Sequence, residues 1–314
     1  MAKKKDYQSD NTILDNSDFA DEDELYNDNS EEDMADKTAR LPRRDIIRIC
    51  IFVIALVLFI FSAASLIKIF SEYQKGVDIY ESIHAAVFIN ESTSMIPEGS
   101  IAETTTYADV TYAELASEDT LNLESVDIDA LKSINSDGIA WIQIPAITRS
   151  YPVAHTDNNS YYLNHTFTRE ENNAGCIFID ARNYADFSDK NTIIYGHNMK
   201  NGTMFGMLNR YEKQDFYKEN DSHFYITTSL GIRVYQIFAV CLVPSDSMVY
   251  EIDFTGDITY ENFLSYVTKS RLYSTGVTVL PTDSVVTLST CTSDSKTRRV
   301  VLGKFIGIVN TSEQ

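Results

Sequence analysis

The residues best suited to chemistry are a cysteine and two arginines near the end of the chain. Cys291 closes the β-branched run VVTLSTC, and Arg298 and Arg299 open the next apolar run, RRVVLGKF. A thiol attacks a carbonyl only as the thiolate, so a free cysteine needs a nearby cation or base. If the two runs are neighbouring strands, the loop between them returns an arginine to Cys291, where its guanidinium could stabilise an oxyanion. Because successive strand residues point to opposite faces, only one of the two arginines can reach the site.

The base for such a thiol must be a histidine, and His197 is the best placed of the five. It follows the apolar run NTIIY across Gly196 and so stands at a strand end, as Cys291 does. A histidine in that place is a candidate general base, and a structural histidine with satisfied hydrogen bonds is the alternative. The other four lie near the apolar N-terminal stretch or in polar contexts that suit surface loops: His84, His155, His165 and His223.

The remaining cysteines do not suggest chemistry. Cys50 lies in a long apolar stretch, and Cys176 and Cys241 lie inside apolar runs, where a cysteine usually behaves as a small buried hydrophobe. Four cysteines do not make a disulfide framework in a chain of 314 residues. The sequence contains neither a CxxC nor an HExxH spacing, so we expect no metal and no cofactor.

Eight runs enriched in β-branched and aromatic residues must position these side chains. Only two helical patterns interrupt them, near residues 204–211 and 261–273, so the pattern predicts a β-barrel or sandwich and not a repeating βαβ fold. A short helix within 126–138 leads into this domain. The runs are AWIQIPAI, SYPVAH, GCIFID, NTIIYGH, HFYITTS, RVYQIFAVCLVP, VVTLSTC and RRVVLGKFIGIV.

The N-terminal part indicates a membrane anchor. Residues 49–67 are 19 consecutive uncharged, mostly apolar positions, long enough at about 1.5 Å per residue to cross a bilayer core of roughly 30 Å. We therefore expect one transmembrane helix over 46–68. Arginines crowd its N-terminal side, so the positive-inside bias predicts a cytoplasmic N-terminus and an extracellular domain.

The segments on either side of the predicted span are polar. Residues 1–45 carry thirteen acidic residues between Asp6 and Asp36, and few aliphatic ones, which predicts a disordered cytoplasmic tail. Residues 69–125 are expected to form a juxtamembrane stalk with short helices, and 126–314 the catalytic domain. The formal net charge of −20 argues against a nucleic-acid partner, which would need a basic surface.

Several motifs in matching order resemble the sortases, the membrane-anchored cysteine transpeptidases of Gram-positive surfaces, and within them class B. They are TLSTC with the downstream arginine, YGHNMKNGTMF around His197, and SDGIAWIQIPA leading into YPVAHTDNNSYYL. The likeness covers roughly residues 126–309. It implies a mainly β fold, a closed eight-stranded sortase-type barrel with peripheral helices, preceded by one transmembrane helix.

The resemblance also implies an activity. Cys291 would cleave a C-terminal sorting motif of secreted proteins through a thioacyl intermediate, and an amine, typically on a peptidoglycan precursor, would resolve it. His197 would act as general acid and base, and Arg299, directly before VVLGKF, would stabilise the oxyanion or hold the substrate.

Four further positions match residues that line the substrate groove in this family: Ser289, Tyr195, Leu163 and Asn159. An acidic residue follows the cysteine closely in some class B members, but here Asp294 stands only third after it, so no accessory role is assigned to it.

Two alternatives remain open at this level. A membrane-tethered cysteine hydrolase would use the same nucleophile and resolve the intermediate with water. A non-catalytic surface binding module with a sandwich ectodomain would have no need for Cys291, so alkylation of the thiol would leave its function unchanged.

Overall fold

The computed structural model describes residues 42–88, 123–291 and 296–309, and of Cys291 it describes the backbone but not the side chain. Residues 1–41 of the predicted disordered tail, which extends over 1–45, and most of the predicted stalk lie outside these ranges. The chain divides into two compact units, Met1–Ile60 and Phe61–Gln314. All the strands belong to the second unit.

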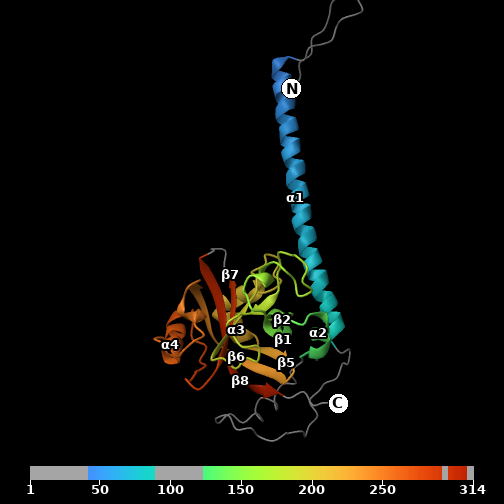
Figure 1. Cartoon of the computed structure of the whole chain (residues 1–314). Coiled ribbons are helices and arrows are strands. Elements are labelled where there is room, and N and C mark those ends of the chain that lie inside the picture. Colours follow the sequence, from blue (N-terminus) through green and yellow to red (C-terminus); the bar gives the residue numbers. More distant parts are fainter. Residues whose placement is uncertain (1–41, 89–122, 292–295, 310–314) are drawn as a thin grey trace, which may run out of the picture. The chain divides into compact units, whose positions relative to one another are not determined.

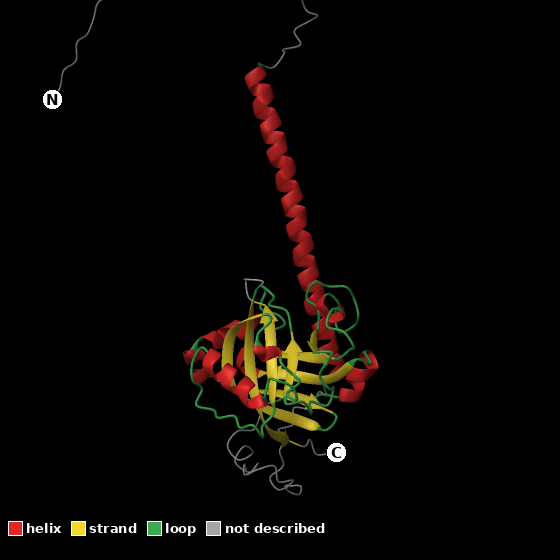
Figure 2. Ribbon diagram, turned by 60° about the vertical axis from the view of Figure 1, so that its left-hand side comes forward, coloured by secondary structure: helices red, strands yellow, loops and turns green. Residues whose placement is uncertain are grey.

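Eight strands close into a barrel in the order β1-β2-β3-β4-β7-β8-β6-β5 (Figures 1 and 2). The predicted eight-stranded barrel is therefore confirmed, and each predicted run contains one strand. The strands are β1 (Gly138–Ile144), β2 (Arg149–Ala154), β3 (Ile177–Ile179), β4 (Asn191–Tyr195), β5 (His223–Thr228), β6 (Gly231–Pro244), β7 (Val285–Cys291) and β8 (Thr297–Val309).

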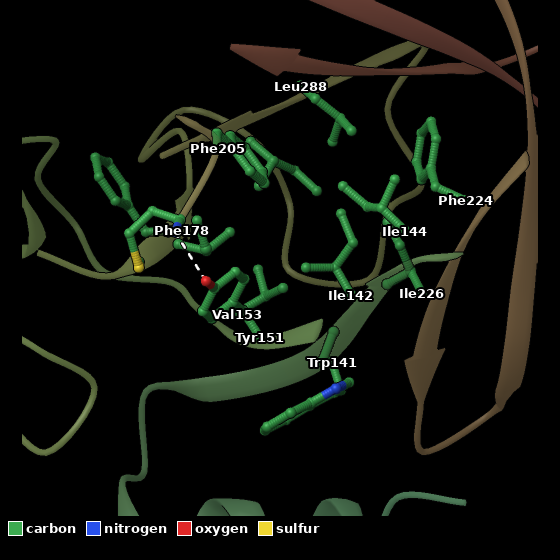
Figure 3. Close-up of a cluster of buried hydrophobic side chains, with 14 of the residues drawn as sticks. Trp141, Ile142, Ile144, Tyr151, Val153, Phe178, Phe205, Phe224, Ile226 and Leu288 are labelled. Atoms are coloured by element: carbon green, nitrogen blue, oxygen red, sulfur yellow. Dashed lines mark hydrogen bonds between the residues drawn. The ribbon is translucent and has the colours of Figure 1, made fainter. Parts of the chain in front are cut away.

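Alternation along the strands separates two apolar cores. In β7 and β8, Leu288 and Val301 belong to the main cluster, which also contains Ile142, Phe224 and Ile226 inside the barrel (Figure 3). The side chains next to them in sequence point the other way, because successive strand residues face opposite sides. Both faces of these strands are therefore buried along most of their length, which explains the unbroken β-branched runs.

The outward-facing residues of β7 and β8 meet a second cluster under α4 (Tyr260–Ser270). Val285, Val300 and Leu302 pack there with Phe263 of the helix. Figure 1 shows α4 beside the barrel. Thr259 caps α4 by accepting a hydrogen bond from the backbone N–H of Asn262. The helix matches the pattern predicted near 261–273.

Short helices fill the other connections. The predicted helix before the domain is α2 (Ile128–Ile134), which Asp127 caps with its carboxylate. The pattern near 204–211 corresponds to the 3-10 helix η3 (Gly206–Glu212), and α3 (Gln214–Glu219), which follows it, was not predicted. Three more 3-10 turns are η1 (Pro145–Ile147), η2 (Tyr161–Leu163) and η4 (Met248–Tyr250).

The N-terminal helix α1 (Arg43–Val87) is long and apolar enough to cross a membrane. It contains the predicted span 46–68 but continues well past it. Tyr80, Ile83 and Val87 are buried in the main core of the second unit. Residues 69–87, expected as the start of a stalk, are therefore one continuous helix packed on the barrel domain.

Candidate active site

Three adjacent strands bring the candidate catalytic positions to one end of the barrel. β4 pairs with β7 in parallel, with Tyr195 beside Ser289, and β7 pairs with β8 in antiparallel fashion, with Cys291 opposite Arg298. The backbone N–H of Gly196 still bonds the carbonyl of Ser289 at 3.1 Å beyond the last paired residue. His197 follows two residues after the end of β4 at Tyr195, and Cys291 follows two residues after Ser289 on β7.

The imidazole of His197 is oriented by the backbone of a distant turn. Its Nε2 lies 2.6 Å from the carbonyl oxygen of Leu163 at the end of η2. A carbonyl only accepts, so Nε2 carries the proton and, in the neutral ring, Nδ1 is the basic nitrogen. The resemblance suggests Leu163 as a groove residue. Its side chain is exposed, and its backbone carbonyl contacts the imidazole.

The backbone of Gly175 packs closely against the imidazole of His197. Its φ is +60°, and a Cβ there would lie 2.9 Å from Cδ2 of His197 and 2.6 Å from the carbonyl oxygen of Tyr162. Only glycine combines this left-handed backbone with so close an approach. A larger residue would push either the imidazole or the η2 turn out of place.

The strand register separates the two arginines. Paired residues of antiparallel strands share a face, so Arg298 lies on the face of position 291 and Arg299 lies with Thr290 on the opposite, inward face. Arg299 is buried and forms a salt bridge with Glu212 at the end of η3. In this register Arg298, and not Arg299, shares the face of position 291. The expected role of Arg299 at the site stays a prediction.

Ser289 and Tyr250 form a polar pair on the outward face of β7, close to Cys291 in the strand. Ser289, two residues before the cysteine, is buried, and its Oγ lies 2.8 Å from the hydroxyl of Tyr250 in η4. The ring of Tyr250 stacks with that of Tyr195 at 6.4 Å between centroids. The structure thus brings two of the four expected groove residues together with one, Tyr250, that the sequence did not single out.

The sequence also did not single out the buried carboxylate of Asp180, which contacts Tyr195. Asp180 follows β3, its side chain is 1% exposed, and its Oδ2 accepts a hydrogen bond from the hydroxyl of Tyr195 at 2.8 Å. Arg182 binds both carboxylate oxygens at 2.9 Å and also donates to the carbonyl of Tyr250 at 3.3 Å. Asn159 joins the same group, since its Oδ1 accepts from the backbone N–H of Ala181 at 2.7 Å.

These bonds keep Asp180 ionised. Burial alone would favour the protonated carboxyl, but hydrogen bonds from Arg182, Tyr195 and Asn159 outweigh it and lower the pKa of Asp180 to about 2. A fixed negative charge therefore ties the expected groove residues Tyr195 and Asn159 to one centre. The only sequence signal was an aspartate at the end of an apolar run, which does not reveal its partners.

Two of the other cysteines are unsuited to nucleophilic chemistry. Cys176 and Cys241 are buried, and burial raises the pKa of each thiol to about 12. They are therefore protonated at neutral pH and behave as the small hydrophobes that their sequence contexts predicted.

Known proteins resemble this chain in sequence and in fold. The sortase domain family matches residues 142–305, and Sortase B of Listeria monocytogenes is 32% identical over 242 residues, covering 76% of this chain and 92% of the relative. The chain is a class B sortase. The solved structure of Staphylococcus aureus sortase B with its substrate matches with a TM-score of 0.55 at 32% identity, covering 58% of this sortase and 85% of that chain.

A second solved structure extends the likeness towards the N-terminus. Sortase B of Bacillus anthracis in complex with AAEK1 matches with a TM-score of 0.59 at 28% identity, over 76% of this sortase and 99% of that chain. These similarities establish a cysteine transpeptidase that acts in cell-wall anchoring and takes sorting-motif substrates. Neither the hydrolase nor the binding module considered from the sequence is favoured. Together with the candidate span in α1, they indicate a membrane-anchored cell-wall enzyme.

Proposed function

We propose that Cys291, His197 and Arg298 carry out the transpeptidation. In the first step the Cys291 thiolate attacks the scissile carbonyl of the sorting motif, and a C–S bond forms while the carbonyl oxygen gains negative charge. The guanidinium of Arg298 stabilises this oxyanion. His197 then gives its proton to the leaving amine as the C–N bond breaks, which leaves a thioacyl enzyme.

The second step reverses these roles. An incoming amine, proposed to belong to a peptidoglycan precursor, attacks the thioacyl carbonyl and forms a new C–N bond. His197 accepts the proton from that amine, and the C–S bond breaks to regenerate the Cys291 thiolate. Both steps balance within the three side chains and the two substrates, so the reaction requires no cofactor.

The proposed orientation follows from the charges around α1. Arg43, Arg44 and Arg48 precede the most apolar stretch, which places the N-terminus in the cytoplasm and the barrel outside by the positive-inside bias. A barrel on the outer side of the membrane meets secreted proteins and wall precursors directly. A single membrane span is sufficient for this arrangement.

The single observation that supports the catalytic assignment is the strand register. Tyr195 and Ser289, which precede His197 and Cys291 by two residues, pair with each other, and Cys291 pairs with Arg298, which supports a site shared by the three side chains. Ser289, Tyr195, Asn159 and Leu163 are proposed to line the groove for the sorting motif, with Tyr250 as an addition. Arg299 is assigned instead to the salt bridge with Glu212.

The test is incubation of the full-length protein in detergent with a library of peptides carrying LPxTG-like or NPxTN-like motifs, with and without a glycine-type amine. Mass spectrometry should find the cleaved peptide joined to the amine, and no product with Cys291→Ala. Cleavage that never yields a ligated product, at any amine concentration, would instead support the hydrolase.

A further inference from the structure

A tyrosine of the N-terminal helix reaches the wall of the active site. Tyr80 lies in the part of α1 that belongs to the barrel unit, its side chain is buried, and its hydroxyl donates a 2.6 Å hydrogen bond to the carbonyl of Gly175. Gly175 is the residue whose Cα lies so close to His197 that a Cβ would collide with the imidazole. Gly175 alone therefore lies between Tyr80 of α1 and the imidazole of His197.

The same tyrosine supports the backbone on the other side of His197. The ring of Tyr80 meets that of Tyr151 edge to face at 5.5 Å. The hydroxyl of Tyr151 accepts a 2.8 Å hydrogen bond from the N–H of Met204 (dashed line in Figure 3). Met204 closes the turn after His197, and the next residue, Phe205, donates its N–H to the His197 carbonyl at 3.0 Å.

Further contacts hold residues 170–175, the loop that contains Gly175, against α1. Asn172 donates to the carbonyl of Glu72 at 3.1 Å, and Asn173 donates to its carboxylate at 2.7 Å. Lys75 forms a 2.9 Å salt bridge with Glu170 at the start of the loop. Residues 170–175 are therefore held between α1 and the turn that binds His197.

We propose that residues 72–87 of α1 form a supporting wall of the active site, and that Tyr80 is a positioning residue for His197. The proposal rests on the proposed role of His197 as general acid and base. Proton transfer requires the imidazole to keep one orientation, which the Leu163 carbonyl selects and the Gly175 backbone confines. The helix that continues from the candidate membrane span thus contributes directly to the chemistry of the domain.

The test compares two conservative substitutions in the full-length protein in detergent. Tyr80→Phe removes the hydrogen bond to Gly175 and keeps the ring. The matched control is Tyr217→Phe, because Tyr217 is equally buried, at 8% exposure, and its hydroxyl donates to a backbone carbonyl, that of Ile237, at 3.1 Å on another part of the barrel. Both variants lose one buried hydroxyl and should lose similar thermal stability.

We expect kcat to fall about five- to twentyfold in Tyr80→Phe with KM within twofold of wild type, because misoriented imidazoles lower the fraction of productive complexes. Tyr217→Phe should keep kcat within twofold. Equal kcat values in the two variants would overturn the proposal. Wild-type turnover that requires Cys291 must be seen first, and its absence would count against the proposed function and not against Tyr80.

A second readout needs no substrate. In protein labelled on histidine, the His197 ring signals, assigned with a His197→Asn variant, should shift or broaden in Tyr80→Phe and stay unchanged in Tyr217→Phe. Unchanged signals in Tyr80→Phe would contradict the positioning role. If Tyr80→Phe does not fold, the double variant Glu72→Gln, Lys75→Gln loosens the same loop from the surface, and we expect it to lower kcat about twofold. A kcat equal to wild type there would equally overturn the proposal.

Discussion

Two adjacent arginines of β8 enter different environments, and the difference shows how one strand serves both fold and site. Arg298 lies on the outward face with position 291, at the end where His197 also stands. Arg299 points inward, is 7% exposed, and is bound to Glu212 of η3. Both residues are arginines. One is a candidate catalytic group and the other a structural one, because neighbouring strand residues point to opposite faces.

The two faces of β7 differ in the same way. Outward, the hydroxyl of Ser289, two residues before position 291, bonds that of Tyr250. Inward, Leu288 belongs to the main core and Thr290 is buried above it. Substitutions on the outward face should therefore change turnover, while substitutions on the inward face should change stability.

The largest effect is expected for the two residues that exchange protons and bonds with the substrate. Cys291→Ala and His197→Ala should each lower kcat/KM by more than about a thousandfold, since one removes the nucleophile and the other the general acid and base. Thermal unfolding of both variants should stay close to wild type. Near-normal turnover in His197→Ala would remove the histidine from the mechanism.

The arginine pair should give opposite results in activity and stability. Arg298→Met should lower kcat/KM by about a hundredfold or more, as expected for loss of an oxyanion-stabilising group, with little change in the free energy of unfolding.

Arg299→Met is the matched inward-face variant. It should keep kcat/KM within about threefold and lower the free energy of unfolding by about 2 kcal/mol, because the charge-assisted bond to Glu212 is lost. Steady-state kinetics and denaturant unfolding of both variants decide the comparison. Retained activity in Arg298→Met with inactive Arg299→Met would reverse our assignment.

The free energy of unfolding at acid pH should report on the hydrogen bonds around Asp180. The folded-state pKa of Asp180, about 2, lies below its ordinary value of 3.8, so its ionisation stabilises the fold above pH 4 and this contribution is lost as the pH falls toward 2. The shift corresponds to about 2 kcal/mol at neutral pH.

Asp180→Asn should therefore lower the free energy of unfolding near pH 6 and weaken its pH dependence between pH 4 and 2. Denaturant titrations at several pH values measure both. An Asp180→Asn protein with the same slope as wild type over that window would show that Arg182 and Tyr195 do not stabilise the ionised carboxylate.

The smallest effect is expected for two neighbouring hydroxyls of β7. Ser289→Ala loses the bond to Tyr250 and should raise KM about two- to threefold. Thr290→Val should leave KM unchanged, because the Thr290 hydroxyl has no hydrogen-bond partner among the described residues and its face points inward. A larger change in KM from Thr290→Val than from Ser289→Ala would contradict the division between the faces.

Much of the fold was predictable because its signals are local. Every strand corresponds to a β-branched run bounded by turn residues, and α4 shows a regular helical spacing after its Thr259 cap. Cys291 and His197 could be singled out because each ends such a run, and their catalytic roles stay predictions. The extension of α1 to Val87 was missed, since residues 69–87 carry no sustained apolar pattern, and only contacts with a distant loop reveal their packing.

The choice between Arg298 and Arg299 could not be made from the chain alone. Which arginine faces the cysteine depends on the register across a loop, and that register fixes every side chain on one face or the other. Glu212, the partner of Arg299, lies far away in sequence, as do the partners of Asp180. Contacts between residues so far apart in the chain cannot be read from a single sequence.

The most direct test of the account follows the covalent intermediate by intact-protein mass spectrometry after mixing with a sorting-motif peptide and no amine. Wild type and Arg299→Met should accumulate a peptide adduct on Cys291 at similar rates, while Arg298→Met and His197→Ala should form it at least about a hundredfold more slowly. An adduct that forms normally in Arg298→Met, or on a residue other than Cys291, would contradict the proposal that these three side chains form one catalytic site.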